Sequence, residues 1–144
     1  MDGNTIPIGE NTTVIVKASG DLFLQGEEQM EVRFQSSEDH IRVNQSNETL
    51  YVETHASLDL AVPRQINVIL EKVGGSAFVQ DLGNSLVIQK IGGDLAVRRA
   101  GVVRIEKVGG GCMVDDIGQA VTINKIGGDL TVRNLAGPLE VNSL

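Results

Sequence analysis

The residues of this chain that could carry catalytic chemistry are few, and the most suggestive of them is an acidic pair. Asp115 and Asp116 are adjacent, and hydrolysis of a polysaccharide would need two cooperating carboxylates. The region is repetitive, however, and the equivalent positions in the flanking repeats carry Arg98–Arg99 and Arg133. We therefore predict that this pair takes part in ion pairs between repeats, and that the protein is not an enzyme.

The histidines and the cysteine do not suggest a metal or redox site either. His40 and His55 lie apart in the sequence and form no ligand cluster, so we predict no metal site. Cys112 is the single cysteine and takes the place that Leu95 and Leu130 occupy in other repeats, which predicts a small buried apolar side chain. No cofactor is expected.

Paired glycines invite comparison with loops that bind phosphate or calcium. A phosphate-binding loop has the form GxxxxGK[ST], whereas here a lysine precedes the glycines. Asp21, Asp94 and Asp129 each follow a glycine, but the GGxGxD pattern of calcium-binding repeats is absent. We predict turn glycines, with aspartates that cap the turns through their side chains.

The strongest signal is internal repetition. The motifs KVGG and KIGG alternate through the second half of the chain at spacings of 18, 17 and 18 residues, and longer strings return after 35 residues. The motifs begin at Lys72, Lys90, Lys107 and Lys125. Such short periods are typical of architectures in which each repeat packs only against its neighbours.

Alignment of the four repeats leaves six columns apolar. Two pairs of columns are two residues apart, which is the period of a strand, and the glycine pairs would interrupt any helix. The sequence therefore predicts an all-β fold, a parallel β-solenoid of 17–18-residue coils. Columns six and eight hold Ala77, Leu95, Cys112, Leu130 and Val79, Val97, Val114, Val132; columns fifteen and seventeen hold Leu86, Val103, Val121, Leu139 and Ile88, Ile105, Ile123, Val141.

Charged residues in the outward columns alternate in sign from one coil to the next. Equivalent residues of stacked coils lie about 4.8 Å apart, so opposite charges would attract along the stack. This explains why the full repeat is 35 residues. The two alternating series are Asp81, Arg99, Asp116 and Arg98, Asp115, Arg133.

The first part of the chain is expected to be β-structured but less regular. KASGDLFLQ at 17–25 is a degenerate copy of KIGGDLAVR, and we predict a β-strand cap over residues 1–57 that continues into regular coils over 58–144, as one domain. Strands are expected at 13–16, 21–24, 30–34, 40–43, 49–52, 58–62 and 66–70.

These motifs resemble those of a known family. The VGGxxxV and IGGDLxV units, the SGDLFL segment, the TLYVET strand and the LAVP turn are similar to the bacterial putative-adhesin β-strand-repeat family, over about residues 12–144. That resemblance implies a β-solenoid and transfers no catalytic residues. A weaker similarity is to the bactofilins, which lack the regular Lys-x-Gly-Gly column.

Composition limits the partners and the location. The net charge of −7 argues against binding to nucleic acid or to anionic membranes, and no apolar run is long enough for membrane insertion. The N-terminus lacks the basic and apolar regions of a signal peptide, so a cytoplasmic protein is expected. A place at the cell surface is the alternative if this chain is a trimmed form.

Two functional hypotheses follow. The first, which we favour, is a structural scaffold-like or adhesin-like protein that self-associates, through the edge of the C-terminal coil or through a lateral face. The second is a monomeric module that presents one face of the solenoid to a protein or carbohydrate ligand. The candidate interaction surface comprises Phe78, Ala96, Met113, Thr131, Leu139 and Val141.

Overall fold

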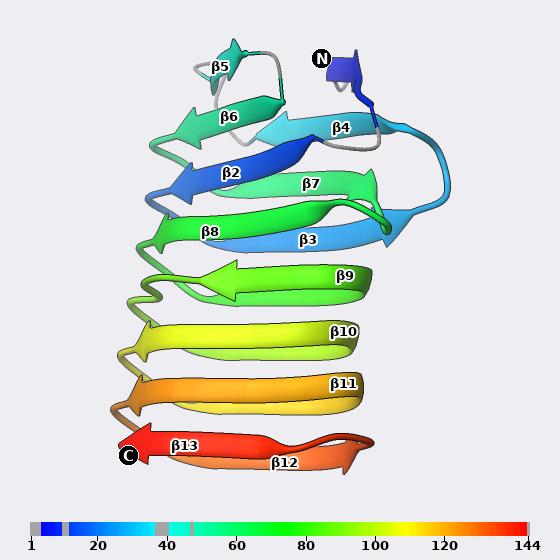
Figure 1. Cartoon of the computed structure of the whole chain (residues 1–144). Coiled ribbons are helices and arrows are strands. Elements are labelled where there is room, and N and C mark those ends of the chain that lie inside the picture. The colour runs from blue at the N-terminus through cyan, green and yellow to red at the C-terminus, as the bar shows by residue number, and fades with distance from the viewer. Residues whose placement is uncertain (1–3, 10–11, 37–40, 47, 144) are drawn as a thin grey trace.

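The computed structural model describes residues 4–9, 12–36, 41–46 and 48–143, which form strands joined by turns (Figure 1). Among these residues there is no helix, and hence none that could cross a bilayer. The all-β prediction is confirmed. The strands are β1 (Asn4–Pro7), β2 (Thr13–Ala18), β3 (Leu22–Glu27), β4 (Glu31–Ser36), β5 (Ile41–Gln45), β6 (Thr49–Thr54), β7 (Leu58–Pro63), β8 (Asn67–Val73), β9 (Ala77–Ile88), β10 (Leu95–Val108), β11 (Cys112–Ile126), β12 (Leu130–Leu135) and β13 (Leu139–Ser143).

All thirteen strands belong to one curled sheet, whose two walls we call face A and face B. The first halves of β9, β10 and β11 lie on face A, and their second halves turn back along face B. Face A contains, in spatial order, β1, β4, β7, β3, β9, β10, β11 and β12. Face B contains β6, β2, β8, β9, β10, β11 and β13. A rung is one strand on each face.

The register follows the repeat. Leu95 pairs with Ala77 on one side and Cys112 on the other, and Ile105 pairs with Ile88 and Ile123, all in parallel. The degenerate segment at 17–25 takes the same register, since Leu22 pairs with Ala77. Its rung, β2–β3, lies between the β6–β7 rung and the β8–β9 rung, so the rungs do not stack in chain order.

The sheet is mixed, which departs from the expected parallel arrangement. β4 runs antiparallel to β7 and to β1, and β5 runs antiparallel to β6. The strands β1, β4 and β5 lie at the end of the stack that holds the N-terminus (Figure 1). At the opposite end, β12 and β13 each pair with β11 alone in the described part of the chain.

The predicted apolar columns form the core. Val79, Val97 and Val114 are completely buried on face A, and Ile88, Ile105 and Ile123 are completely buried on face B. The last rung differs, because no further rung covers it in the described structure. Its inward side chains are only partly buried, and Leu139 is 44% exposed.

The Gly-Gly pairs are required by close approach of the backbones. A Cβ atom on Gly92, Gly109 or Gly127 would lie 2.5, 2.6 or 2.4 Å from a carbonyl oxygen of the preceding rung. None of the described glycines has a positive φ. Glycine is therefore needed at these positions for space between rungs, and not for an unusual backbone conformation.

Non-glycine residues take the left-handed backbone conformation at the corner between the two faces. Asp81, Arg99, Asp116 and Asn134 have φ values of 63°, 54°, 62° and 51°. They are successive members of one column, next to a register shift in the ladder between Ala100 and Val102. Asp and Asn tolerate this conformation comparatively well, so three of the four residues in this column suit the left-handed backbone of the corner.

Candidate functional site

A groove of about 780 Å³ runs along face A across successive rungs. One outward residue per rung forms its floor, and the strand register places these residues in a continuous row. Phe23 and Met113 are 43% and 38% exposed, and the rings of Phe23 and Phe78 meet edge to face with centroids 5.1 Å apart. The floor row is Phe23, Phe78, Ala96, Met113 and Thr131.

The groove contains four of the six predicted interaction residues. Leu139 and Val141 lie elsewhere, on β13 of face B, where they belong to the inward columns of the last rung. Phe23 was missed by sequence reasoning. Its signal was present, because aligning the degenerate segment with the regular repeats puts Phe23 in the column of Phe78, as the register shows.

Side chains along one border of the groove hydrogen-bond to the next rung. The Asp21 Oδ1 atom accepts from the Ser76 backbone N–H at 2.9 Å, and Asp94 Oδ1 accepts from the Gly111 N–H at 2.9 Å. Between them, Ser76 Oγ accepts from the Asp94 N–H at 3.2 Å. These bonds join neighbouring rungs and do not close the aspartates' own turns, so for Asp21 and Asp94 the predicted local capping is replaced by a link between rungs.

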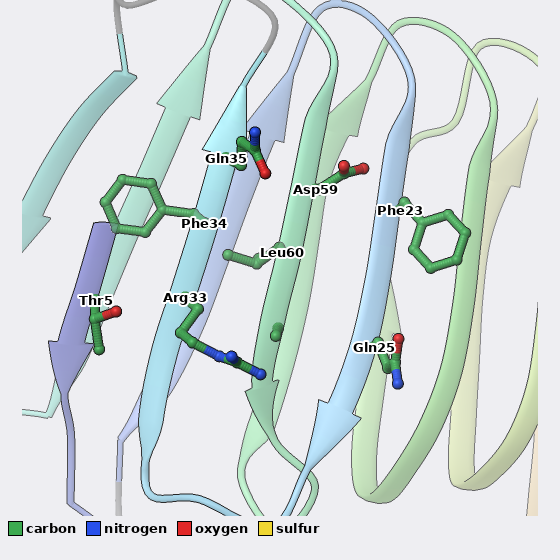
Figure 2. A pocket seen from close by; sticks show the side chains of 9 residues that line it. Thr5, Phe23, Gln25, Arg33, Phe34, Gln35, Asp59 and Leu60 are labelled. Atoms are coloured by element: carbon green, nitrogen blue, oxygen red, sulfur yellow. The ribbon is translucent and has the colours of Figure 1, made fainter. Parts of the chain in front are cut away.

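A second hollow of about 520 Å³ adjoins the groove at its N-terminal end. The two hollows share Phe23 and Asp59. Figure 2 shows Gln35, Asp59 and Phe23 side by side on three strands of face A, with Gln25 further along the strand that carries Phe23. This end of the surface therefore combines an exposed ring with amide and carboxylate groups.

Arg33 is the cation of this second hollow, and it is already paired. Its guanidinium donates to the Glu27 carboxylate, and this hydrogen bond, together with the charge of Glu27, raises the pKa of Arg33. The positive charge at this end of face A is therefore partly neutralised within the protein.

The predicted charge alternation is confirmed for one pair. Arg99 donates to both oxygens of Asp81, at 2.5 and 3.1 Å, and this hydrogen bonding lowers the pKa of Asp81. The other series does not pair as expected. Asp115 instead accepts a hydrogen bond from Asn134 Nδ2 at 3.0 Å, and no ion pair to Asp115 forms in the described part of the chain.

The remaining candidate groups do not form a reactive site. Cys112 is 4% exposed, as predicted, and burial raises the pKa of its thiol to about 12. Such a thiol is a poor nucleophile at neutral pH. His55 is exposed on the surface, while His40 lies outside the described residues. Among described residues, no three His, Cys, Asp or Glu side chains are grouped so that they could hold a metal ion.

Comparison with known proteins gives distant structural similarities. The chain matches no protein-family model and no curated protein. Solved structures similar to it include a putative cell adhesion protein from Clostridium sporogenes (9% identity, 99% of both chains, TM-score 0.36). A putative adhesin from Bacteroides fragilis is also similar (10% identity, 99% of this chain and 96% of that chain, TM-score 0.37). Similarities this low carry no argument on function, and they give the bactofilin similarity no support.

Proposed function

We propose that this protein is a non-enzymatic, adhesin-like binding module, a parallel β-solenoid whose face A presents the groove to a ligand. The stacked rungs supply a rigid support, because each rung is bonded to the next through both backbone and side chains. The groove would be equally accessible on a cytoplasmic protein and at the cell surface.

The observation that carries this proposal is the exposure of large apolar side chains in a hollowed row. Phe23 and Met113 are both more than one third exposed, and both lie in the groove. Scattered exposed apolar residues need no explanation, but a contiguous apolar row in a concave surface marks a binding site.

The test is an affinity measurement with a panel of ligands and matched variants. The panel contains a basic peptide, an acidic peptide, a neutral oligosaccharide and an acidic polysaccharide fragment, each titrated calorimetrically. We expect at least one to bind, and we expect Phe23→Ser combined with Met113→Ser to weaken it at least tenfold. Val87→Ser is the control, because Val87 is a partly buried outward residue of face B. Failure of every ligand to bind would count against the proposal, as would equal effects of the groove and control variants.

Self-association through the C-terminal edge is a second candidate, supported by a separate observation. The inward residues of the last rung are partly exposed, with Leu139 at 44%. The exposed Asp129 side chain occupies the border position at which Asp21 and Asp94 each accept a hydrogen bond from a backbone N–H of the next rung. An incoming strand would bury the apolar residues of the last rung and donate a backbone N–H to the Asp129 carboxylate.

Particle mass from sedimentation equilibrium tests this second candidate. The native chain is compared with one that carries a short Pro- and Lys-containing segment after Leu144, which would block strand addition at the edge. A mass that rises with concentration only for the native chain supports edge association. A monomer at high micromolar concentration would refute it, and an oligomer indifferent to the added segment would move the contact to a lateral face.

A further inference from the structure

The charged residues that line the groove all carry the same sign. The charged residues that line it, within the described chain, are Asp21, Asp59, Asp94 and Asp129, with no lysine or arginine among them. All four side chains are exposed; Asp59 pairs with Phe23 at the end of the floor row, and the floor row is mainly apolar. A complementary ligand therefore needs positive charge together with apolar groups, because charge complementarity selects the partner and apolar contact supplies affinity.

The spacing of the carboxylates restricts the ligand further. Asp21, Asp94 and Asp129 directly precede β3, β10 and β12, which are alternate strands of face A. Neighbouring strands are about 4.8 Å apart, so successive carboxylates of this border are separated by about 9.6 Å. Charges on a ligand that runs along the groove must match this repeat.

The spacing of the carboxylates matches a peptide in the polyproline II conformation better than a peptide in a β-strand. In polyproline II helix, residues recur on the same side every third position, and a rise of about 3.1 Å per residue places them about 9.3 Å apart. In a β-strand, same-side residues are only about 6.7 Å apart. The carboxylate spacing therefore favours polyproline II geometry.

The carboxylates are held in place yet have capacity left for a ligand. Asp21 and Asp94 each use Oδ1 for one backbone N–H of the next rung. A carboxylate has about four acceptor positions, so each can accept from an ammonium or guanidinium group as well. Between these charges, Phe23, Phe78 and Met113 offer the exposed ring and thioether surface on which proline-rich segments dock.

We propose that the groove binds an extended, polyproline II-like segment of another protein that carries Lys or Arg at every third residue, with apolar residues between. This inference rests on the proposed function and names the class of partner. The basic residues would pair with Asp21, Asp94 and Asp129, and the intervening side chains would contact the floor row.

Fluorescence anisotropy with synthetic peptides tests this proposal on the intact chain. The probe is a labelled peptide of four Lys-Leu-Pro units, and the control peptide has the same composition with its lysines clustered at one end. We expect the periodic peptide to bind at least fivefold more tightly. Asp94→Asn should weaken its binding by about two- to fivefold, as expected for loss of an exposed ion pair. Glu140→Gln, which removes one negative charge from face B, should leave the affinity unchanged.

The outcomes separate this inference from the function on which it rests. Equal affinity for the periodic and clustered peptides would overturn the inference, because it would show attraction by net charge alone. Equal weakening by Asp94→Asn and Glu140→Gln would also overturn it. If the periodic peptide fails while another ligand of the panel binds in a groove-dependent way, the inference fails and the proposed function stands. If no ligand binds in the groove, both fail.

Discussion

At the scale of single residues, the corner between the two faces depends on side chains in an unusual backbone conformation. Aspartate, arginine, aspartate and asparagine occupy successive positions with φ between 51° and 63°. For an L-residue this conformation costs about 1–2 kcal/mol, and Asp and Asn bear it best. A β-branched residue would raise that cost.

Substitution of Asp116 tests the backbone strain directly. Because its φ is 62°, Asp116→Val should lower the free energy of unfolding by about 1–2 kcal/mol. Asp116→Gly should leave it within about 0.5 kcal/mol, since glycine adopts this conformation without a steric clash. Urea denaturation measures both values. A valine variant as stable as the glycine variant would mean that the corner is not in the left-handed region.

The Asp81–Arg99 pair makes a prediction about pH. The hydrogen bond from Arg99 lowers the pKa of Asp81, so the carboxylate stabilises the fold above the ordinary aspartate pKa of about 3.9. This contribution is lost as the pH falls through the lower pKa of the folded state.

In Arg99→Gln, the pKa of Asp81, followed by NMR of its carboxyl carbon, should rise toward its ordinary value. Arg98→Gln should raise it less, because Arg98 acts on Asp81 only through its charge. Equal shifts in the two variants would show that the hydrogen bond is not the main cause.

At the scale of elements, the glycine pairs set the distance between rungs. The sequence predicted turns at these positions, and the structure adds that the glycines have ordinary φ values and are needed for close approach. That reason could not be derived from one sequence, because it depends on the carbonyl of a neighbouring rung. The periodicity of the apolar columns, by contrast, was sufficient to predict which residues of successive repeats pair with one another.

Gly109→Ala should destabilise the protein by about 1–3 kcal/mol, the usual cost of overpacking. Its Cβ would lie 2.6 Å from the Gly92 carbonyl oxygen. Gly118→Ala is the matched control, because the nearest atom to its Cβ is 3.9 Å away. Thermal unfolding of the two variants gives the comparison, and similar melting temperatures would contradict the proposed role of the glycine pairs.

The inward and outward columns of β11 can be told apart by one pair of substitutions. Val114→Asp would bury a carboxylate in a completely buried position and should unfold the C-terminal rungs. Thr122→Asp lies on an outward, partly exposed position of the same strand and should change stability by at most about 0.5 kcal/mol. Circular dichroism during thermal unfolding measures both. Equal destabilisation would show that the register is wrong.

At the scale of the whole molecule, the order of the rungs determines how long the groove is. Phe23 reaches the row because the β2–β3 rung lies beside β8–β9, although β4 to β7 intervene in the sequence. Local patterns predicted the strand at 21–24 but contain no information on which rung would be its neighbour. The antiparallel β4 and β5 were unpredictable for the same reason, since pairing direction depends on long-range packing.

The central claim is that the groove of face A is the surface through which this protein binds its partner. Methyl NMR tests it most directly, because Met113 lies in the groove floor while Met30 directly precedes β4 and lines neither hollow. With methionine methyl groups labelled, the protein is titrated with the periodic basic peptide and with each ligand of the panel. We predict that a ligand that binds will shift the Met113 signal in a saturable manner and leave Met30 unchanged. A ligand that binds with no effect on Met113 would contradict the claim.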